Sequence, residues 1–236
     1  MKISTFDPGP LTEQVTPGGL RYLTHAIRPG TPVANEAVIS FSGRVRLDPS
    51  GPWMPFRATE TIHAGRSYRV TAHARRGPLR AKIEDTYDAG RARSRVRVLG
   101  IIPVRSQDGA DLVRSARGRL VVESTWLPSA YLPAYGTRWS AGDDGENITV
   151  PIDGEDIEAV LHLGAEGELV ELRLLRWSNL TEDGRYGWVP FSAKVHAHRS
   201  FDGYTIPSDI RASWATGTER EFEFFHATVE HAQFRA

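Results

Sequence analysis

Short segments in which polar and apolar residues alternate, separated by turns rich in glycine and proline, constrain the fold of this chain most strongly. In residues 67–75, tyrosine, valine and alanine alternate with arginine, threonine and histidine, which is typical of a strand with one buried and one solvent-facing side. The turns between most segments are short, which favours antiparallel neighbours. Strands are expected at residues 38–47, 53–64, 67–75, 79–87, 93–104, 148–152, 158–163, 169–178, 188–198, 208–214 and 221–233.

The hydrophobic period changes once, over residues 108–126. Apolar residues there recur every three to four positions from Leu112 to Leu120, and Asp108 or Asp111 is available as an N-cap. This segment is expected to be the main helix.

A sheet of this many strands must curl, split or close. The expected fold is mainly β: a large curved antiparallel sheet or half-open barrel of about eleven strands, with one principal helix capping its concave face. A flattened sandwich satisfies the same strand count. Residues 1–236 are expected to form a single domain, with residues 1–35 as a lead-in of turns and one short helix at 17–26, and the main helix, 108–127, between two groups of strands.

Composition excludes several kinds of chemistry. The 236 residues include no cysteine, so disulfides, thiolate zinc sites and cysteine nucleophiles are ruled out. No P-loop, G-x-G-x-x-G or H-E-x-x-H signature occurs, and no cofactor is expected. No apolar run approaches the roughly 18 residues of a membrane span, and the N-terminus lacks the apolar core of an export signal, so a cytoplasmic location is expected.

Charge is balanced overall, with 29 basic and 29 acidic residues, but residues 66–105 hold eleven Lys or Arg and three acids. This basic region could bind an anionic polymer. Its arginines at 91, 93, 95 and 97 recur every second residue, however, which indicates an ordinary solvated strand face. Nucleic-acid binding is not expected, because the aromatic residues of a single-strand binder are absent there.

Glu123 is the leading candidate for an acid or base. It follows Leu120 by three residues and so lies on the buried side of the helix, where a carboxyl group is partly desolvated. Arg119, four residues earlier, can instead pair with it and attach the helix to the sheet, and this structural interpretation is favoured. Asp85 and Tyr87 share one strand face, where they could bind or protonate a ligand together, but a turn aspartate and a satisfied core tyrosine are the favoured interpretation.

The run from Arg119 to Pro133, which contains E-x-x-W-x-P-S-A-x-L-P, carries a family resemblance. Together with W-x-P-F at residues 53–56, D-x-Y at 85–87 and G-Y-x-I-P-S at 203–208, it resembles an uncharacterised bacterial family of unknown function, from about Tyr22 onward. The resemblance implies a shape similar to the curved sheet with a helical plug of periplasmic lipoprotein carriers. The absence of an export signal argues against lipoprotein traffic. The family's recurring positions would correspond to Asp85, Tyr87, Arg119, Glu123, Trp126 and Pro128.

Aromatic residues offer candidate ligand contacts, since ligand pockets are mostly apolar with a few polar anchors. The candidates, with Arg119 as the polar anchor, are Trp53, Trp126, Trp139, Trp177, Trp214 and Tyr131, and Trp188 completes the set of six tryptophans. In a large β core the same residues are equally ordinary packing residues. His196 and His198 have the spacing of two metal ligands on one strand face, but no third ligand is evident and no metal is expected.

The expected function is the binding of an apolar small molecule, such as a lipid, polyketide or terpenoid, in a cavity of the curved sheet beneath the helix. The alternative is a cofactor-independent enzyme in the same cavity that catalyses an isomerisation, cyclisation or hydrolysis with Glu123 as acid or base. The sequence leaves the ligand and the oligomeric state open.

Overall fold

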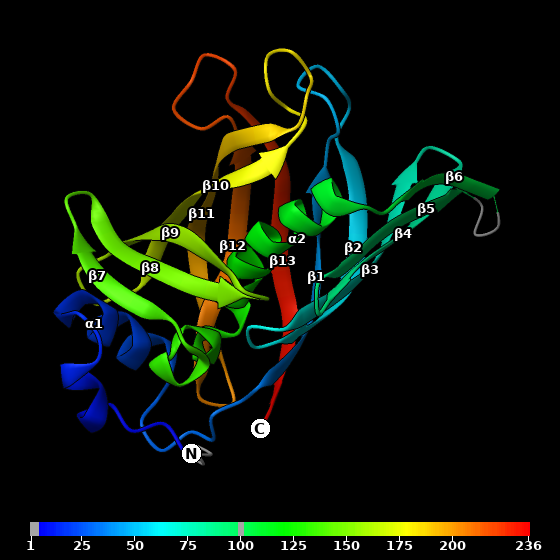
Figure 1. Ribbon diagram of the computed structural model, residues 1–236. Coiled ribbons are helices and arrows are strands. Elements are labelled where there is room, and N and C mark those ends of the chain that lie inside the picture. The colour runs from blue at the N-terminus through cyan, green and yellow to red at the C-terminus, as the bar shows by residue number, and fades with distance from the viewer. Residues whose placement is uncertain (1–4, 99–101) are drawn as a thin grey trace.

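All the strands belong to one open antiparallel sheet (Figure 1). The computed structural model describes residues 5–98 and 102–236, with the backbone alone at 76, 79 and 102–105. In this part of the chain the sheet has 13 strands in the order β6-β5-β4-β3-β2-β1-β13-β12-β11-β10-β9-β8-β7. The strands are β1 (Glu36–Val45), β2 (Met54–His63), β3 (Ser67–Arg76), β4 (Leu79–Asp88), β5 (Arg91–Val98), β6 (Ile102–Gln107), β7 (Arg138–Gly142), β8 (Gly145–Ile152), β9 (Glu155–Leu163), β10 (Leu169–Ser178), β11 (Gly187–Phe201), β12 (Tyr204–Trp214) and β13 (Phe222–Arg235).

The predicted fold class is confirmed, and two strands are added to it. The segment expected at 93–104 forms β5 and β6, and its residues 99–101 lie outside the described residues. The short strand β7 was not predicted, because its five residues, RWSAG, show almost no alternation. It pairs with β8 across a tight turn and forms one edge of the sheet.

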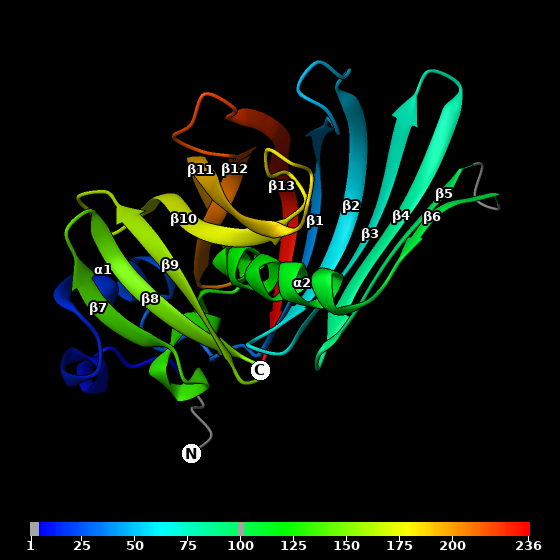
Figure 2. The same ribbon diagram turned by 45° about the horizontal axis from the view of Figure 1, so that its top comes forward.

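The chain order explains where the main helix lies. Strands β1–β6 run outward to one edge of the sheet, and strands β7–β13 return from the other edge until β13 pairs with β1. The helix α2 (Ala110–Glu123) therefore has to connect the two edges. It crosses the concave face, packs mainly on β10, and also contacts β3, β4 and β5 (Figure 2). It thereby joins the two halves of the curved sheet.

Helix α2 begins differently from the prediction. Its N-cap is Gly109, and no side chain caps it. Asp111 instead accepts a hydrogen bond from Trp177 Nε1 at 2.8 Å, which attaches the start of the helix to β10. Gly118 lies against β10, where an added Cβ would meet Arg176 Cγ at 3.4 Å, so a small residue allows this close approach.

Three 3-10 turns and a second helix close the end of the fold near β7. The turns η2 (Ser124–Trp126), η3 (Pro128–Tyr131) and η4 (Pro133–Tyr135) follow α2 directly. Helix α1 (Pro17–Ala26), found where it was predicted, packs beside them. None of the helices in the described ranges is long and apolar enough to span a membrane.

Candidate functional site

A row of polar side chains crosses the concave face next to α2. The strand register places Glu60 of β2, Val70 of β3, Asp85 of β4 and Ser94 of β5 side by side. Because side chains alternate along a strand, these four point to the same face of the sheet. The polar row thus lies at the point where α2 meets the first half of the sheet.

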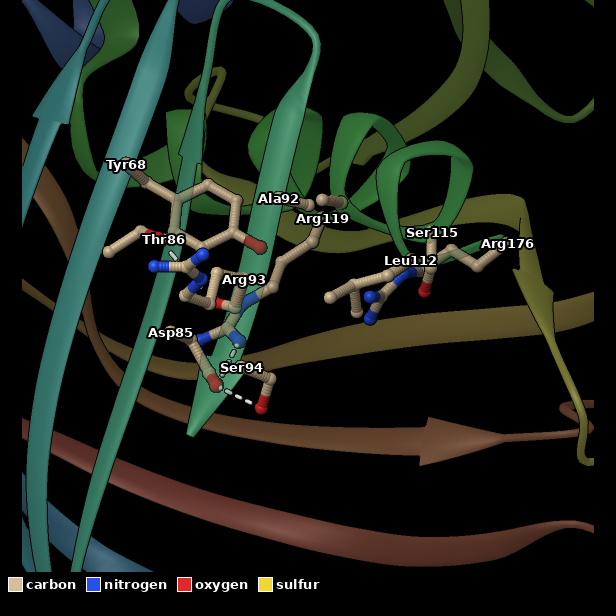
Figure 3. A pocket seen from close by; sticks show the side chains of 11 residues that line it. Tyr68, Asp85, Thr86, Ala92, Arg93, Ser94, Leu112, Ser115, Arg119 and Arg176 are labelled. Carbon is tan, nitrogen blue, oxygen red and sulfur yellow. Dashed lines mark hydrogen bonds and ion pairs between the residues drawn. The ribbon is translucent and has the colours of Figure 1, made fainter. Parts of the chain in front are cut away.

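Arg119 of α2 connects this row to the helix (Figure 3). Its Nη1 donates to Asp85 Oδ2 at 2.9 Å and its Nε donates to Glu123 Oε1 at 2.8 Å. Ser94 Oγ donates to the other oxygen of Asp85 at 2.6 Å. The guanidinium carbon of Arg119 lies 4.9 Å from the ring centre of the buried Tyr68. The structure thus brings together Asp85, Arg119 and Glu123 and contains the favoured Arg119–Glu123 pair.

Glu60 is the most deeply buried carboxyl group of the cluster, with 0% of the residue exposed. Neither of its oxygens has a hydrogen-bond donor among the described residues. Burial, followed by the negative charge of Glu123, raises the pKa of Glu60 well above its usual range. Glu60 and Glu123 are thus two neighbouring carboxyl groups, and the negative charge of Glu123 favours the protonated form of Glu60.

The raised pKa of Glu60 predicts that the stability of the folded protein depends on pH. The pKa of Glu60 is higher in the folded than in the unfolded state. The stability that protonated Glu60 contributes is therefore fully present below the unfolded pKa, and it is lost as the pH rises through the folded pKa. Glu60→Gln imitates the protonated acid and can still donate to Glu123. We expect Glu60→Gln to raise the melting temperature at pH 8 and to change it little at pH 4.5, as measured by calorimetry. An equal shift at both pH values would contradict this assignment.

Arg176 of β10 approaches the cluster from the second half of the sheet. It is 8% exposed, and its guanidinium carbon lies 4.7 Å from the ring centre of Phe191 and 4.8 Å from that of Trp214. It lines a pocket of about 90 Å³ between α2 and β4–β5, together with Arg119 and Asp85 (Figure 3). This pocket has polar and apolar lining in equal measure and is too small to enclose a lipid, so it differs from the apolar cavity expected beneath the helix.

An apolar strip adjoins the polar row on the side away from Tyr68. The next two rows of concave-face residues, defined by the strand register, are Ala58, Ala72, Ile83 and Val96, then Phe56, Ala74, Ala81 and Val98. The strands carrying them extend past α2, and no described element crosses in front of them (Figure 2). Ile83, Ala81, Val96 and Val98 remain partly exposed. We call these eight residues the apolar strip.

Aromatic side chains continue this apolar surface toward Arg176. Phe56 stacks on Phe225 at 5.4 Å, and Phe224 lies 5.9 Å from Trp214, which contacts Arg176. Phe224 and Phe225 are partly exposed. The concave face thus combines an accessible apolar surface with a buried polar cluster.

Tyr87 does not join the Arg119 cluster, although it shares a strand face with Asp85. Its hydroxyl donates to Asp153 in the β8–β9 turn, and burial together with this bond raises the pKa of Tyr87 to about 12. Its ring stacks on Tyr68 at 6.2 Å. The position of Tyr87 therefore fits the simpler interpretation of a satisfied core tyrosine.

The candidate aromatic residues do not gather in one place. Trp214 contacts Arg176, a lining residue of the small pocket, and Trp126 is buried with its ring centre 4.9 Å from that of Phe41. The others lie elsewhere: Trp53 packs on His226, Trp139 and Tyr131 on Tyr22, and Trp177 on the half-exposed Trp188. The structure therefore supports packing roles for most of them.

The two histidines of β11 are separated by an irregularity in the strand. Register shifts fall between Val195 and Ala197 and between Ala197 and His198, which interrupts the alternation on which a shared face depends. His198 packs edge-on against His25, with ring centres 5.8 Å apart. The residues that the structure describes contain no group of three or more His, Cys, Asp or Glu arranged for a metal.

Two other surfaces remain. The basic region at 66–105 lies mainly on the outer face of β3–β5, where Arg91 and Arg93 are exposed; the side chain of Arg105 is outside the described set. An open groove of about 810 Å³ crosses β8–β11, lined in part by Leu175, which is 54% exposed, and Trp188, which is 50% exposed. Its lining also includes Arg173, Lys194 and other charged residues.

Three members of the cluster were missed in the sequence: Glu60, Tyr68 and Arg176. The alternation of polar and apolar residues along β2 and β10 could have identified two of them. Glu60 occupies a buried-face position between Ala58 and Ile62, and Arg176 follows Leu174 by two residues on the buried side of β10. A charged residue at such a position must be paired, neutralised or functional.

The open curved sheet around a single crossing helix defines a class of fold, and comparisons with solved structures agree. The crystal structure of a LolA superfamily protein from Nitrosomonas europaea is similar with a TM-score of 0.50 and 8% identity, over 94% of each chain. At this identity the likeness shows the fold alone. A putative outer membrane lipoprotein-sorting protein domain from Vibrio parahaemolyticus matches with a TM-score of 0.46 and 7% identity, over 86% of each chain. A DUF1329 family protein from Desulfovibrio piger matches with a TM-score of 0.44 and 8% identity, over 85% of this chain and 86% of that one.

The chain belongs to DUF6544, a family of unknown function, whose model matches residues 20–227. This confirms the resemblance to a family without assigned activity. The search of curated proteins returns no match.

Proposed function

We propose that this protein binds an apolar small molecule, such as one with an acyl or polyprenyl chain, along the apolar strip of the concave face. The observation that supports this most directly is the register of β2–β5. It places eight apolar residues, four of them alanine, on the concave side of the sheet beyond α2, and the four on β4 and β5 are partly exposed. Small side chains on a concave sheet leave room for a ligand that large side chains would fill.

The polar cluster gives the strip one polar end. The row with Asp85 and Ser94 directly adjoins the apolar strip, and Asp85 is bonded to Arg119 of α2. A chain lying on the strip would therefore direct its polar end toward α2. Pockets of this kind combine a mostly apolar wall with a few placed polar groups. Each methylene group removed from water contributes about 0.8 kcal/mol, so affinity should increase with chain length.

The test begins with native mass spectrometry and organic extraction of the purified protein. We expect a co-purifying apolar molecule, or, if extraction has emptied the site, stepwise tighter binding across a series of alkyl chains from eight to sixteen carbons. Titration calorimetry measures this series. No bound molecule, together with no binding of any member of the series, would contradict the proposal.

An enzyme acting on the same ligand is the second candidate. The observation that favours it is the neighbouring pair of carboxyl groups, Glu60 and Glu123, next to Arg119, where burial raises the pKa of Glu60 well above its usual range. Such a pair can donate and accept a proton in an isomerisation, cyclisation or hydrolysis. Glu123→Gln should then abolish conversion of the extracted molecule while leaving its affinity unchanged, whereas a carrier shows no conversion in either protein.

A further inference from the structure

Arg176 is a buried cation without a partner. The residue is 92% buried, and the described residues offer it neither a carboxylate within ion-pair distance nor a hydrogen-bond acceptor. Burial and the nearby charge of Arg119 lower the pKa of Arg176 to about 10, so it stays charged at neutral pH. Removing a charge from water without pairing it is costly, and such sites are usually completed by an opposite charge.

The neighbouring arginines Arg117 and Arg119 each form an ion pair with a carboxylate, and in this they differ from Arg176. Arg119 bonds two carboxylates, Asp85 and Glu123. Arg117, on the same helix, pairs with Glu155 at 2.8 Å. Asp85 and Glu123 are thus already engaged by Arg119, and burial raises the pKa of the third acid, Glu60, well above its usual range. Arg176 is therefore the arginine of this cluster that has no carboxylate partner of its own among the described residues.

The aromatic neighbours of Arg176 determine which edge of its guanidinium can donate hydrogen bonds. Phe191 and Trp214 both lie within cation–π distance of its guanidinium carbon. Aromatic rings interact with the flat faces of a guanidinium and leave the N–H edge for an acceptor. Figure 3 shows the side chain approaching the pocket from the side opposite Asp85 and Ser94.

The pocket itself has the size of a small head group. Its volume of about 90 Å³ is roughly three times the volume of one water molecule in the liquid. Its lining also includes Ser94 and Ser115, whose hydroxyl groups are potential donors. The fork of a guanidinium matches the two oxygens of a planar carboxylate, so a carboxylate head group fits an arginine that has no carboxylate partner.

We propose that Arg176 binds the carboxylate head group of the ligand, so that the ligand is a long-chain carboxylic acid whose chain lies on the adjoining apolar surface. This inference rests on the proposed function and names its ligand class. It also explains why the concave face pairs an uncovered apolar strip with an unpaired buried cation.

The test compares dodecanoate, dodecanol and dodecyl phosphate by titration calorimetry at pH 7.5. We expect wild type to bind dodecanoate at least about tenfold more tightly than dodecanol, and Arg176→Met to bind both equally. Arg173→Met is the matched control, because Arg173 lies on the same strand, is 45% exposed in its side chain and pairs with Glu171. It should keep the preference of wild type.

A second readout separates ligand binding from a structural role. Without ligand, Arg176→Met should melt at the same or a higher temperature than wild type, because it removes an unpaired buried charge. A lower melting temperature would overturn the proposal, as would equal binding of dodecanoate and dodecanol by wild type. Tighter binding of dodecyl phosphate would assign the site to phosphate and overturn the carboxylate. If wild type binds none of the three, the proposed function itself fails.

Discussion

Arg119→Met is expected to lower the free energy of unfolding by about 2–3 kcal/mol, because its charge network is partly buried and lies between an exposed pair and a fully buried one. Arg119 balances Asp85 and Glu123 directly and lies beside Glu60, so its loss leaves carboxylates buried without a cation. It also removes the main bond between α2 and β4. Urea denaturation followed by circular dichroism measures the change.

Arg138→Met provides the control for this substitution. Arg138 also forms an arginine–carboxylate pair, with Asp156 at 2.7 Å, but both side chains are more than half exposed. An exposed pair of this kind contributes about 0–1 kcal/mol. The destabilisation by Arg119→Met should also decrease at low pH, where the carboxylates take up protons. A loss no larger than that of Arg138→Met would show that the cluster does not hold α2 to the sheet.

Ile83→Gln is expected to weaken binding of a long-chain ligand at least about tenfold. Ile83 lies in the middle of the apolar strip, two residues from Asp85 and partly exposed. A ligand chain lying over it would bury the glutamine amide without a hydrogen bond, which costs about 1–3 kcal/mol in proteins. Calorimetric titration with the tightest ligand of the alkyl series measures the loss.

Lys82→Gln is the matched control for Ile83→Gln. It introduces the same side chain one residue earlier on β4, where it points to the outer face and loses only a partly exposed pair with Glu84. Both variants should keep the melting temperature of wild type within a few degrees. Equal affinities for the two variants would show that the ligand does not lie on the strip.

The sequence predicted the sheet well because a period of two needs only local information. Helix α2 was found for the same reason, since its apolar positions from Leu112 to Leu120 repeat with a helical period. The N-cap was wrong because capping depends on tertiary contacts: Asp111 bonds Trp177 of β10, 66 residues away. Strand β7 was missed because its pairing with β8, rather than its own five residues, makes it a strand.

The site was predicted in part, and the limit has a physical cause. The Arg119–Glu123 pair follows from helical spacing alone. Asp85 joins this pair across 34 residues, and Arg176 reaches the cluster from the opposite half of the sheet, which no local pattern specifies. The tryptophans could not be placed relative to one another, because a sequence shows which residues are large and apolar but not which of them meet.

The most direct test of the account is a methyl NMR titration of the protein with dodecanoate. We predict that the largest shift changes occur at Ile83, Val96 and Ala72 of the apolar strip, with the Arg176 side-chain Nε resonance moving in parallel. Leu175, exposed in the groove over β8–β11, should stay unchanged. Shift changes centred on Leu175, with the strip residues unaffected, would place the ligand on the other face and contradict the central claim.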